Sequence, residues 1–517
     1  MSPSTTTATE TITTTHSIGD ELANIDLGDK RLNRRVQSVL ENLAANPTAN
    51  LPNAQKGRSE LVAAYRLFDN ENVTWEKLMH PHWACAEQRA KLHPVVLALQ
   101  DTTELNYNGQ QISGLGPLSY PTQRGMYLHA TLMITPDRIS LGVADAWMYA
   151  RELSAEQAAK LPPACVTQKS EQRKASAEKK KAKAEQRSGT ATTAATACIN
   201  QVEPASACQD TPEPALPTCK ESVRWIEGYD RIADMAPDLG EGTRVVYVAD
   251  REGDLLGLMK RAQQRNHPID WLVRAKHNRK LYEGEKLWES VAATEPLGTI
   301  KFECAGQKGK KARIVTQEIR ALPVKLGKHG TIPATCIIAT EVGAPAGTEP
   351  LTWRLLTNRA ATTLEMAIEL IEWYRARWEI EIFFHVLKNG CTVEKLQLDT
   401  IEKVQNALAL YMIVAWRIMY LMRMGRACPD LPAELVFEPD EVRTAYLLQE
   451  EELPKDRLPK INEVLRLIAQ IGGFLARKGD GEPGVQTIWR GMQQVRVAVT
   501  TVQILRKLGQ LKPGDDE

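Results

Sequence analysis

Short apolar runs alternate with helical patterns through the middle of the chain. The runs at 95–99, 245–249 and 271–275 have the composition of buried strands. Two further runs, 127–134 and 139–143, are separated by a Thr-Pro-Asp turn, so we expect them to form a meander with the first run. Strands that alternate with helices predict an α/β core.

Helical periodicity dominates both ends of the chain, which indicates helical domains on either side of this core. The polar segment 155–218, rich in Lys, Ala, Thr and Pro, is expected to be a disordered insertion. Segment 281–357 has short β-like runs separated by Gly and Pro, which predicts an inserted β-rich subdomain. The predicted units are a disordered lead at 1–17, a helical domain at 18–74, an α/β domain at 75–425 and a C-terminal helical domain at 426–517.

Composition excludes few classes of protein. A chain of 517 residues can bury large cores, and its nine cysteines form neither a C-x-x-C pair nor a zinc-like cluster, which favours a reducing cytoplasm. The first residues lack a secretory pattern, and no membrane association is expected. The net charge of +1 hides basic clusters, so DNA contacts would come from patches. These clusters are Lys30, Arg31, Arg34 and Arg35; Arg274, Lys276, Arg279 and Lys280; and Lys308, Lys310, Lys311 and Arg313.

Two acidic residues follow predicted central strands. Asp101 stands just beyond the run at 95–99, and Asp250 just beyond the run at 245–249. Sites in α/β folds form at the carboxyl ends of such strands. An Asp after a strand can also simply begin a turn or cap a helix, but two acids in equivalent places favour a shared site.

A third acidic residue lies in the helical pattern at 371–388. At about 100° per residue, Tyr374, Arg377, Glu381 and Lys388 fall within an arc of about 60°. This stripe suits a metal-binding carboxylate beside groups that hold phosphates. The alternative is a solvated face with ion pairs between successive turns.

The three acids together suit cleavage of phosphodiesters. The attacking and leaving oxygens both carry charge in the transition state, and two divalent ions about 3.5–4 Å apart can stabilise both. Magnesium prefers oxygen ligands and keeps several waters, so three carboxylates from separate elements suffice. The sequence therefore predicts a site for two Mg²⁺ ions, with Mn²⁺ as a substitute.

With these residues, the chain resembles the bacterial DDE transposases that have a ribonuclease-H-like catalytic core. The Y-(2)-R-(3)-E-(6)-K motif of their insertion-sequence branch is matched by Tyr374, Arg377, Glu381 and Lys388. Other fragments occur in the family's order across residues 27–474. They are Ala64-Tyr-Arg66, Gln100-Asp-Thr-Thr103, Arg124-Gly125 with His129, Glu221-Ser222 with Trp225, Asp250-Arg-Glu252, Lys276-His277 with Arg279-Lys280, and Trp353 with Leu355-Leu-Thr357.

The resemblance implies a magnesium-dependent DNA nuclease and strand transferase, with Asp101, Asp250 and Glu381 as the metal-binding catalytic triad. It implies cut-and-paste movement through a hairpin intermediate, and a homodimer that joins two inverted-repeat ends and target DNA. The enzyme would lie in the bacterial cytoplasm, on the nucleoid when bound. The implied DNA-binding residues are Tyr374, Arg377, Lys388, the stacking Trp353, Arg274, Lys276, Arg279, Lys280, Lys30, Arg31, Arg34 and Arg66.

Two departures limit the carry-over, and two other functions compete with transposition. The Lys-rich insertion is much longer here than in the family, although this does not touch the triad. The family has paired tryptophans after Arg124-Gly125, where this chain has Met126-Tyr127, so a stacking role there does not transfer. A catalytically silent DNA-binding repressor of transposition would share the fold, but the retained triad and motif favour activity. A different ribonuclease-H-like nuclease would leave the N-terminal domain and β-rich insertion unexplained.

Overall fold

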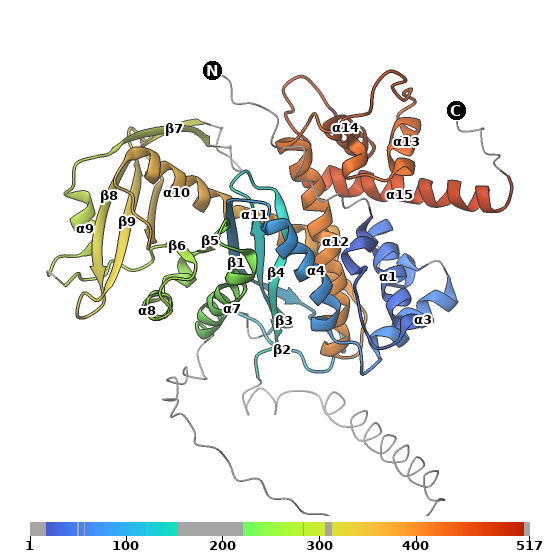
Figure 1. Ribbon diagram of the computed structural model, residues 1–517, viewed down its shortest axis with the longest axis horizontal. Helices are drawn as coiled ribbons and strands as arrows, with labels where there is room; N and C mark the ends of the chain where they lie inside the picture. The colour runs from blue at the N-terminus through green and yellow to red at the C-terminus, as the bar shows by residue number, and fades with distance from the viewer. Residues whose placement is uncertain are drawn as a thin grey trace, which may run out of the picture.

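The computed structural model describes residues 17–48, 51–55, 57–120, 122–152, 221–282, 284–304 and 313–510. Most of the predicted lead and the whole predicted insertion at 155–218 lie outside the described residues. The described elements form a mixed sheet with helices on both faces, a helical unit before the sheet and another after it (Figure 1). The predicted α/β class is therefore confirmed.

The sheet has ten strands and an antiparallel meander at one side. Its order is β2-β3-β1-β5-β6-β10-β9-β8-β7, and β4 pairs with β3 off this path. Strands β1, β5 and β6 run parallel, while β3 and β4 continue β1 as antiparallel neighbours, as predicted. The strands are β1 Val95–Asn106, β2 Gly116–Pro117, β3 Arg124–Ile134, β4 Ser140–Tyr149, β5 Arg244–Ala249, β6 Asp270–Arg274, β7 Gly298–Cys304, β8 Arg313–Leu326, β9 Ile332–Glu341 and β10 Thr352–Thr357.

Alternate residues of β1 enter two separate cores because strand side chains point alternately to opposite faces. Leu97 and Leu99 join the core with α11 (Trp378–His385) and α12 (Ile401–Ala427). Val96 and Ala98 join the core with α7 (Val223–Leu239) and α8 (Leu256–Gln264). Both faces of the central strands are thus buried, which explains why their sequences are apolar runs.

The segment 281–357, predicted as a β-rich insertion, contains the strands β7 to β10, and these strands extend the central sheet because β10 pairs with β6. This segment also contains a short helix, α9 (Leu287–Ala292). Strand β1 is longer than its apolar run, since pairing with β3 continues to Asn106, so Asp101 lies inside the strand rather than beyond it.

The N-terminal helical unit packs against the core through α4. Its elements are η1 Ile18–Leu22, α1 Lys30–Ala45, α2 Leu51–Ala54 and α3 Arg58–Phe68, followed by α4 Trp75–Ala90. Asp29 caps α1, and Thr74 caps α4, because their side-chain oxygens accept hydrogen bonds from backbone amides of the first turn. The apolar sides of these helices contribute to the same core as α12.

A long apolar helix, α12, links the sheet to the C-terminal helices α13 (Pro439–Leu448), α14 (Ile461–Ile471) and α15 (Val485–Lys507). By length and composition alone, α12 could cross a membrane, and it is the one such helix among the described residues. Its apolar window is completely buried inside the protein, where α1, α4 and α14 pack around it (Figure 1). This burial is typical of the central helix of a packed core.

Candidate active site

The parallel pairing of β1 with β5 brings two of the predicted acids together. Gln100 pairs with Ala249, so Asp101 and Asp250 each stand one residue further along neighbouring strands. Asp250 caps the short helix η3 (Arg251–Gly253) by accepting a hydrogen bond from the backbone amide of Glu252 at 2.7 Å. Capping was the alternative interpretation of Asp250, and this residue both caps and faces the site.

The third acid, Glu381, reaches the same place from α11. The helical pattern predicted at 371–388 divides at Arg377, where α10 (Leu364–Ala376) ends and α11 begins. Nη1 of Arg377 lies 3.0 Å from Oδ2 of Asp101, and its Nη2 lies 2.5 Å from Oε1 of Glu381. The guanidinium group therefore ties the strand carboxylate to the helix carboxylate.

Burial and the charges at this site change the pKa of Asp101. The pKa of Asp101 is raised to about 6, mainly by burial and to a smaller extent by the nearby Asp250 and Glu381, while Arg377 and the backbone amide of Thr102 oppose the rise. Like charges that meet in a partly buried place disfavour ionisation. A perturbed carboxyl group with charged neighbours is a common sign of a functional site.

Tyr374 and Lys388 occupy different surroundings, although one stripe was predicted. Tyr374 is buried, its ring centre lies 6.0 Å from the Arg377 guanidinium carbon, and burial raises its pKa. Lys388 lies in a π-helical turn, Val386–Gly390, which shifts residues away from the 100° spacing. Burial lowers the pKa of Lys388, and the acids that oppose this effect are Glu394 and Glu104 rather than the triad.

The donor atoms suit a hard divalent cation, because all three acids offer carboxylate oxygens. Among the described residues, however, no group of three or more acidic, His or Cys side chains is arranged to hold a metal ion. The guanidinium of Arg377 instead stands between Asp101 and Glu381. The residues therefore fit such an ion by chemistry, provided that Arg377 releases one of these carboxylates.

An aromatic group stands at the same edge of the sheet, on the β10 side. Because β10 is antiparallel to β6, its first residues lie beside the carboxyl end of β6. Trp353 is partly exposed and stacks on Phe302, with ring centres 5.7 Å apart and an interplanar angle of 20°. The guanidinium carbon of Arg375 lies 5.8 Å from the centre of Trp353, so this side chain belongs to a mixed stack rather than to the deep core.

The predicted basic residues divide into exposed and structural groups. Lys276 and Lys280 are exposed, as are Lys30, Arg31, Arg34 and Arg66 in the N-terminal unit. Arg279 instead pairs with the buried Asp254 at 2.6 Å, and Asp254 also accepts hydrogen bonds from the backbone amides of Lys276 and His277. Arg279 therefore holds its own loop in place, which conflicts with a primary role in DNA contact. Arg274 ends β6, half-buried near Tyr374.

Sequence reasoning missed a buried polar network between the N-terminal unit and the core. Glu21 of η1 pairs with His82 at 2.5 Å and with Arg89 at 2.7 Å, and these two partners belong to α4. The three residues lie far apart in the chain, and no motif links them. The signal in the sequence was His82, a polar residue at a position of α4 where helical spacing predicts a buried apolar side chain.

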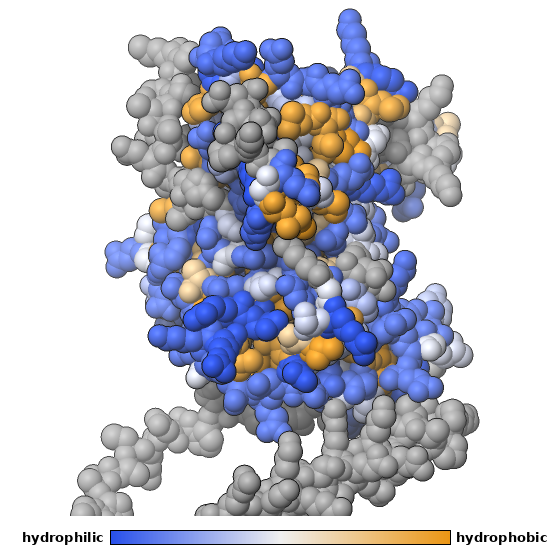
Figure 2. Space-filling model, turned by 90° about the vertical axis from the view of Figure 1, so that its right-hand side faces the viewer, coloured by the Kyte–Doolittle hydropathy of each residue, from blue (hydrophilic) through white to orange (hydrophobic). Residues whose placement is uncertain are grey.

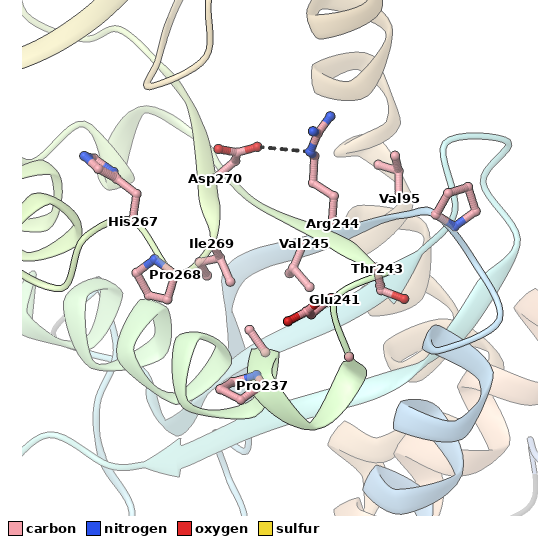
Figure 3. Close-up of a pocket in the computed structure, with 14 residues that line it drawn as sticks. Val95, Pro237, Glu241, Thr243, Arg244, Val245, His267, Pro268, Ile269 and Asp270 are labelled. Atoms are coloured by element: carbon pink, nitrogen blue, oxygen red, sulfur yellow. Dashed lines mark ion pairs between the residues drawn. The ribbon is translucent and has the colours of Figure 1, made fainter.

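A cavity of about 900 Å³ lies at the opposite edge of the sheet, where β1, β5 and β6 begin. Figure 3 shows Arg244 and Asp270 on its wall, with their ion pair at 3.8 Å. Asp101 lies in the middle of β1 and Asp250 follows the last residue of β5, whereas the cavity is lined by the first residues of these strands, so the cavity is separated from both acids along the strands. We therefore do not assign the catalytic site to it.

Comparison with known families identifies the class. Residues 16–73 match the model described as transposase DNA-binding, residues 220–417 match the transposase DDE domain, and residues 413–510 match the transposase Tn5 dimerisation domain. The chain therefore belongs to the DDE transposases, of the Tn5-like kind. The match to the DDE domain implies a ribonuclease-H-like core. It includes Asp250 and Glu381 and begins after Asp101.

A solved structure has a weaker likeness. It is described as a cryo-EM structure of the piggyBac transposase synaptic complex with hairpin DNA, and it is 9% identical with a TM-score of 0.33. The match covers 83% of this chain and 58% of that one, so the chain spans less than two thirds of its length.

Proposed function

We propose that the protein catalyses cut-and-paste transposition, with Asp101, Asp250 and Glu381 as the acids that hold two Mg²⁺ ions. The observation that carries this proposal is that Arg377 bridges Asp101 and Glu381, while Asp250 lies close enough to Asp101 to raise its pKa. When bound, divalent ions would supply the charge stabilisation that phosphodiester cleavage and strand joining need, and Mn²⁺ should substitute for Mg²⁺.

In this proposal, Arg377 serves as a resident counter-ion. Without it, Asp101 and Glu381 would repel each other within a partly buried site. A guanidinium that is released from a carboxylate can donate two parallel hydrogen bonds to a phosphate. Arg377 would therefore balance the acids before DNA binds and grip the substrate phosphate afterwards, with Tyr374 packed behind it.

The Trp353 stack would serve hairpin formation. A tight hairpin needs one base to leave the helix, at a cost of a few kcal/mol, and stacking on an aromatic side chain offsets about 1–3 kcal/mol of this cost. We expect Trp353→Ala to keep first-strand nicking while hairpin products fall sharply. Equal loss of both steps, with a lower melting temperature, would instead indicate a purely structural tryptophan.

DNA-end recognition is assigned to the exposed cations Lys30, Arg31, Arg34 and Arg66, and pairing of two ends to the C-terminal helices. On α15, Val495 and Val499 are buried inside the protein, whereas Val497 and Ile504 are each 49% exposed. Figure 2 views the side of the molecule that lies on the right in Figure 1. Its upper part, where Figure 1 places the C-terminal helices, shows apolar surface. Exposed apolar surface of this kind is typical of a subunit interface. Such an enzyme would act on the nucleoid in a bacterial cytoplasm.

The decisive experiment compares cleavage with binding. The substrate would be a duplex that carries the inverted repeats expected on both sides of the gene, and Asp101→Asn is expected to abolish Mg²⁺-dependent cleavage while a gel shift shows near-normal binding. The matched control is Asp137→Asn, which changes an exposed acid in the turn before β4. Cleavage retained by Asp101→Asn would refute the triad, and binding without cleavage by the wild type would indicate a silent repressor.

A further inference from the structure

A second cavity opens at the catalytic edge of the sheet, on the other face of β1. Asp101 turns toward Arg377 and α11, whereas its neighbour Thr102 turns toward the opposite face, which α7 covers. There the Thr102 hydroxyl lies 2.6 Å from Nδ1 of His129, a residue of β3. The cavity reaches from Thr102 to Lys276, and its volume is about 480 Å³. Pockets that bind small organic groups have volumes of about 300–1,000 Å³, so this cavity has the size of a ligand site.

One wall of the cavity is a stack of flat groups. Tyr127 of β3 and Tyr149 of β4 are register partners, and their rings stack with centres 5.1 Å apart and an interplanar angle of 15°. The guanidinium carbon of Arg151 lies 4.4 Å from the centre of Tyr127, and that of Arg224 lies 3.2 Å from the centre of Tyr149. Trp147, 39% exposed, lies beside this stack on β4 but does not line the cavity, and its ring centre is 6.0 Å from the guanidinium carbon of Arg224. We call the four side chains Tyr127, Tyr149, Arg151 and Arg224 the tyrosine stack.

The charges around the cavity indicate what it can hold. Arg224 and Lys276 could contact a phosphate, but Glu104, Glu221 and Glu252 also line the cavity and would disfavour a small free anion. Carboxylates accept hydrogen bonds from the amino and imino groups of bases, and guanidinium planes and aromatic rings stack on base faces. This combination fits a nucleotide that presents both a base and a backbone phosphate.

The position of the cavity indicates where that nucleotide comes from. In the sheet order, β3 lies on one side of β1 and β5, and β10 lies on the other. The Trp353 stack and the tyrosine stack thus stand on opposite sides of the carboxylates. Trp353 lies beside Arg375 of α10 and the tyrosine stack beside Arg224 of α7, so a DNA strand that crosses the end of the sheet at the acids would meet one stack on each side of its reacting phosphate.

We propose that this cavity binds an unstacked nucleotide of the DNA strand, on the side of the reacting phosphate opposite to Trp353. This role rests on the proposed function, since it needs a strand at the carboxylates. It also gives Tyr127 a stacking role of its own, although the paired tryptophans of the family are absent here. The competing explanation is that the tyrosine stack only braces α7 against β4.

The test uses binding of fluorescein-labelled single strands by the full chain in EDTA, measured by anisotropy. The probes are a twelve-residue oligothymidylate and an abasic strand with the same phosphates. Because each stacked base strengthens binding about fivefold or more, we expect the wild type to prefer the strand with bases. Arg224→Gln and Tyr149→Leu should each reduce this preference at least fivefold, and Tyr149→Phe should restore it.

Arg231→Gln is the matched control, because Arg231 lies two turns further along α7, stacks on Trp147 at 5.0 Å and pairs with Asp145, outside the cavity. We expect Arg231→Gln to keep the preference for the strand with bases. If Arg231→Gln and Arg224→Gln lose the preference for bases equally, with equally lowered melting temperatures, the tyrosine stack has only a structural role between α7 and β4. This result would overturn the inference.

Two further outcomes separate this inference from the proposed function. If Trp353→Ala abolishes the preference for bases while Tyr149→Leu leaves it intact, the inference fails and the proposed stacking at Trp353 stands. If free thymidine monophosphate displaces the strand at its own micromolar concentrations, the cavity is a site for free nucleotides, which also overturns it. Failure of the triad would appear separately, as cleavage by Asp101→Asn.

Discussion

Replacing Glu21 with Gln should lower the free energy of unfolding, because Glu21 belongs to a buried network between the N-terminal unit and the core. Glu21 and His82 are fully buried, and the Arg89 side chain is nearly so. The backbone amide of Val143 donates to Nε2 of His82, so the Nδ1–H group of this neutral imidazole faces Glu21. Arg89 also lies over the ring of Trp416 at 4.3 Å, so the network joins η1 to α4, β4 and α12.

The magnitude follows from the pKa of Glu21. Burial alone would raise it, but His82 and Arg89 outweigh burial and lower it from 4.5 to about 2. This difference corresponds to about 3 kcal/mol in the free energy of unfolding at neutral pH. Removing one partner of a buried ion pair commonly costs about 3–5 kcal/mol, which agrees with this figure.

The pH dependence has a definite sign. Because the pKa is lower in the folded state, the stabilisation is fully present above about pH 4.5 and is lost as the pH falls through about 2. The gap between wild type and Glu21→Gln should therefore stay constant from pH 6 to 8. Burial also lowers the pKa of His82, so the wild type should lose stability as protonation of His82 becomes favourable below about pH 6.5.

Urea unfolding followed by tryptophan fluorescence measures this effect, with Glu76→Gln as the control at an exposed position of α4. We expect the control to change the free energy of unfolding by less than about 0.5 kcal/mol. A Glu21→Gln protein within about 1 kcal/mol of the wild type at pH 7 would refute the reasoning, because the network would then contribute no more than an exposed pair.

Three further results are expected. Arg377→Gln should make the melting temperature depend more strongly on Mg²⁺ than in the wild type, because Asp101 and Glu381 lose their counter-ion, and an unchanged dependence would contradict this role. Neutralising Lys30 or Arg31 should lower the salt slope of end binding by about one each, measured by titration at several salt concentrations, unless these cations make no phosphate contacts. Val497→Asp should leave single-end binding intact but stop paired-end complexes in gel shifts, and normal pairing would exclude this face of α15.

Several features of the protein follow from local sequence alone. The runs around Val96 and Val246 are strands because both of their faces are buried, and this burial leaves an apolar signature in the sequence. Asp101, Asp250 and Glu381 could be chosen as a set because strand ends and helix spacing are local properties. The tertiary structure then brings them together through the parallel register of β1 and β5 and the approach of α11.

Other features depended on the tertiary structure because they rest on contacts between distant segments. Arg377 was expected to hold phosphate, but its position between two acids depends on where α11 meets β1. Arg279 looked like a DNA contact, whereas the burial of Asp254 makes it a structural partner. The single sheet formed by β6 and β10, and the tyrosine stack, arise from strand pairing and side-chain packing. Neither leaves a periodic signal along the chain, so only the folded structure could decide them.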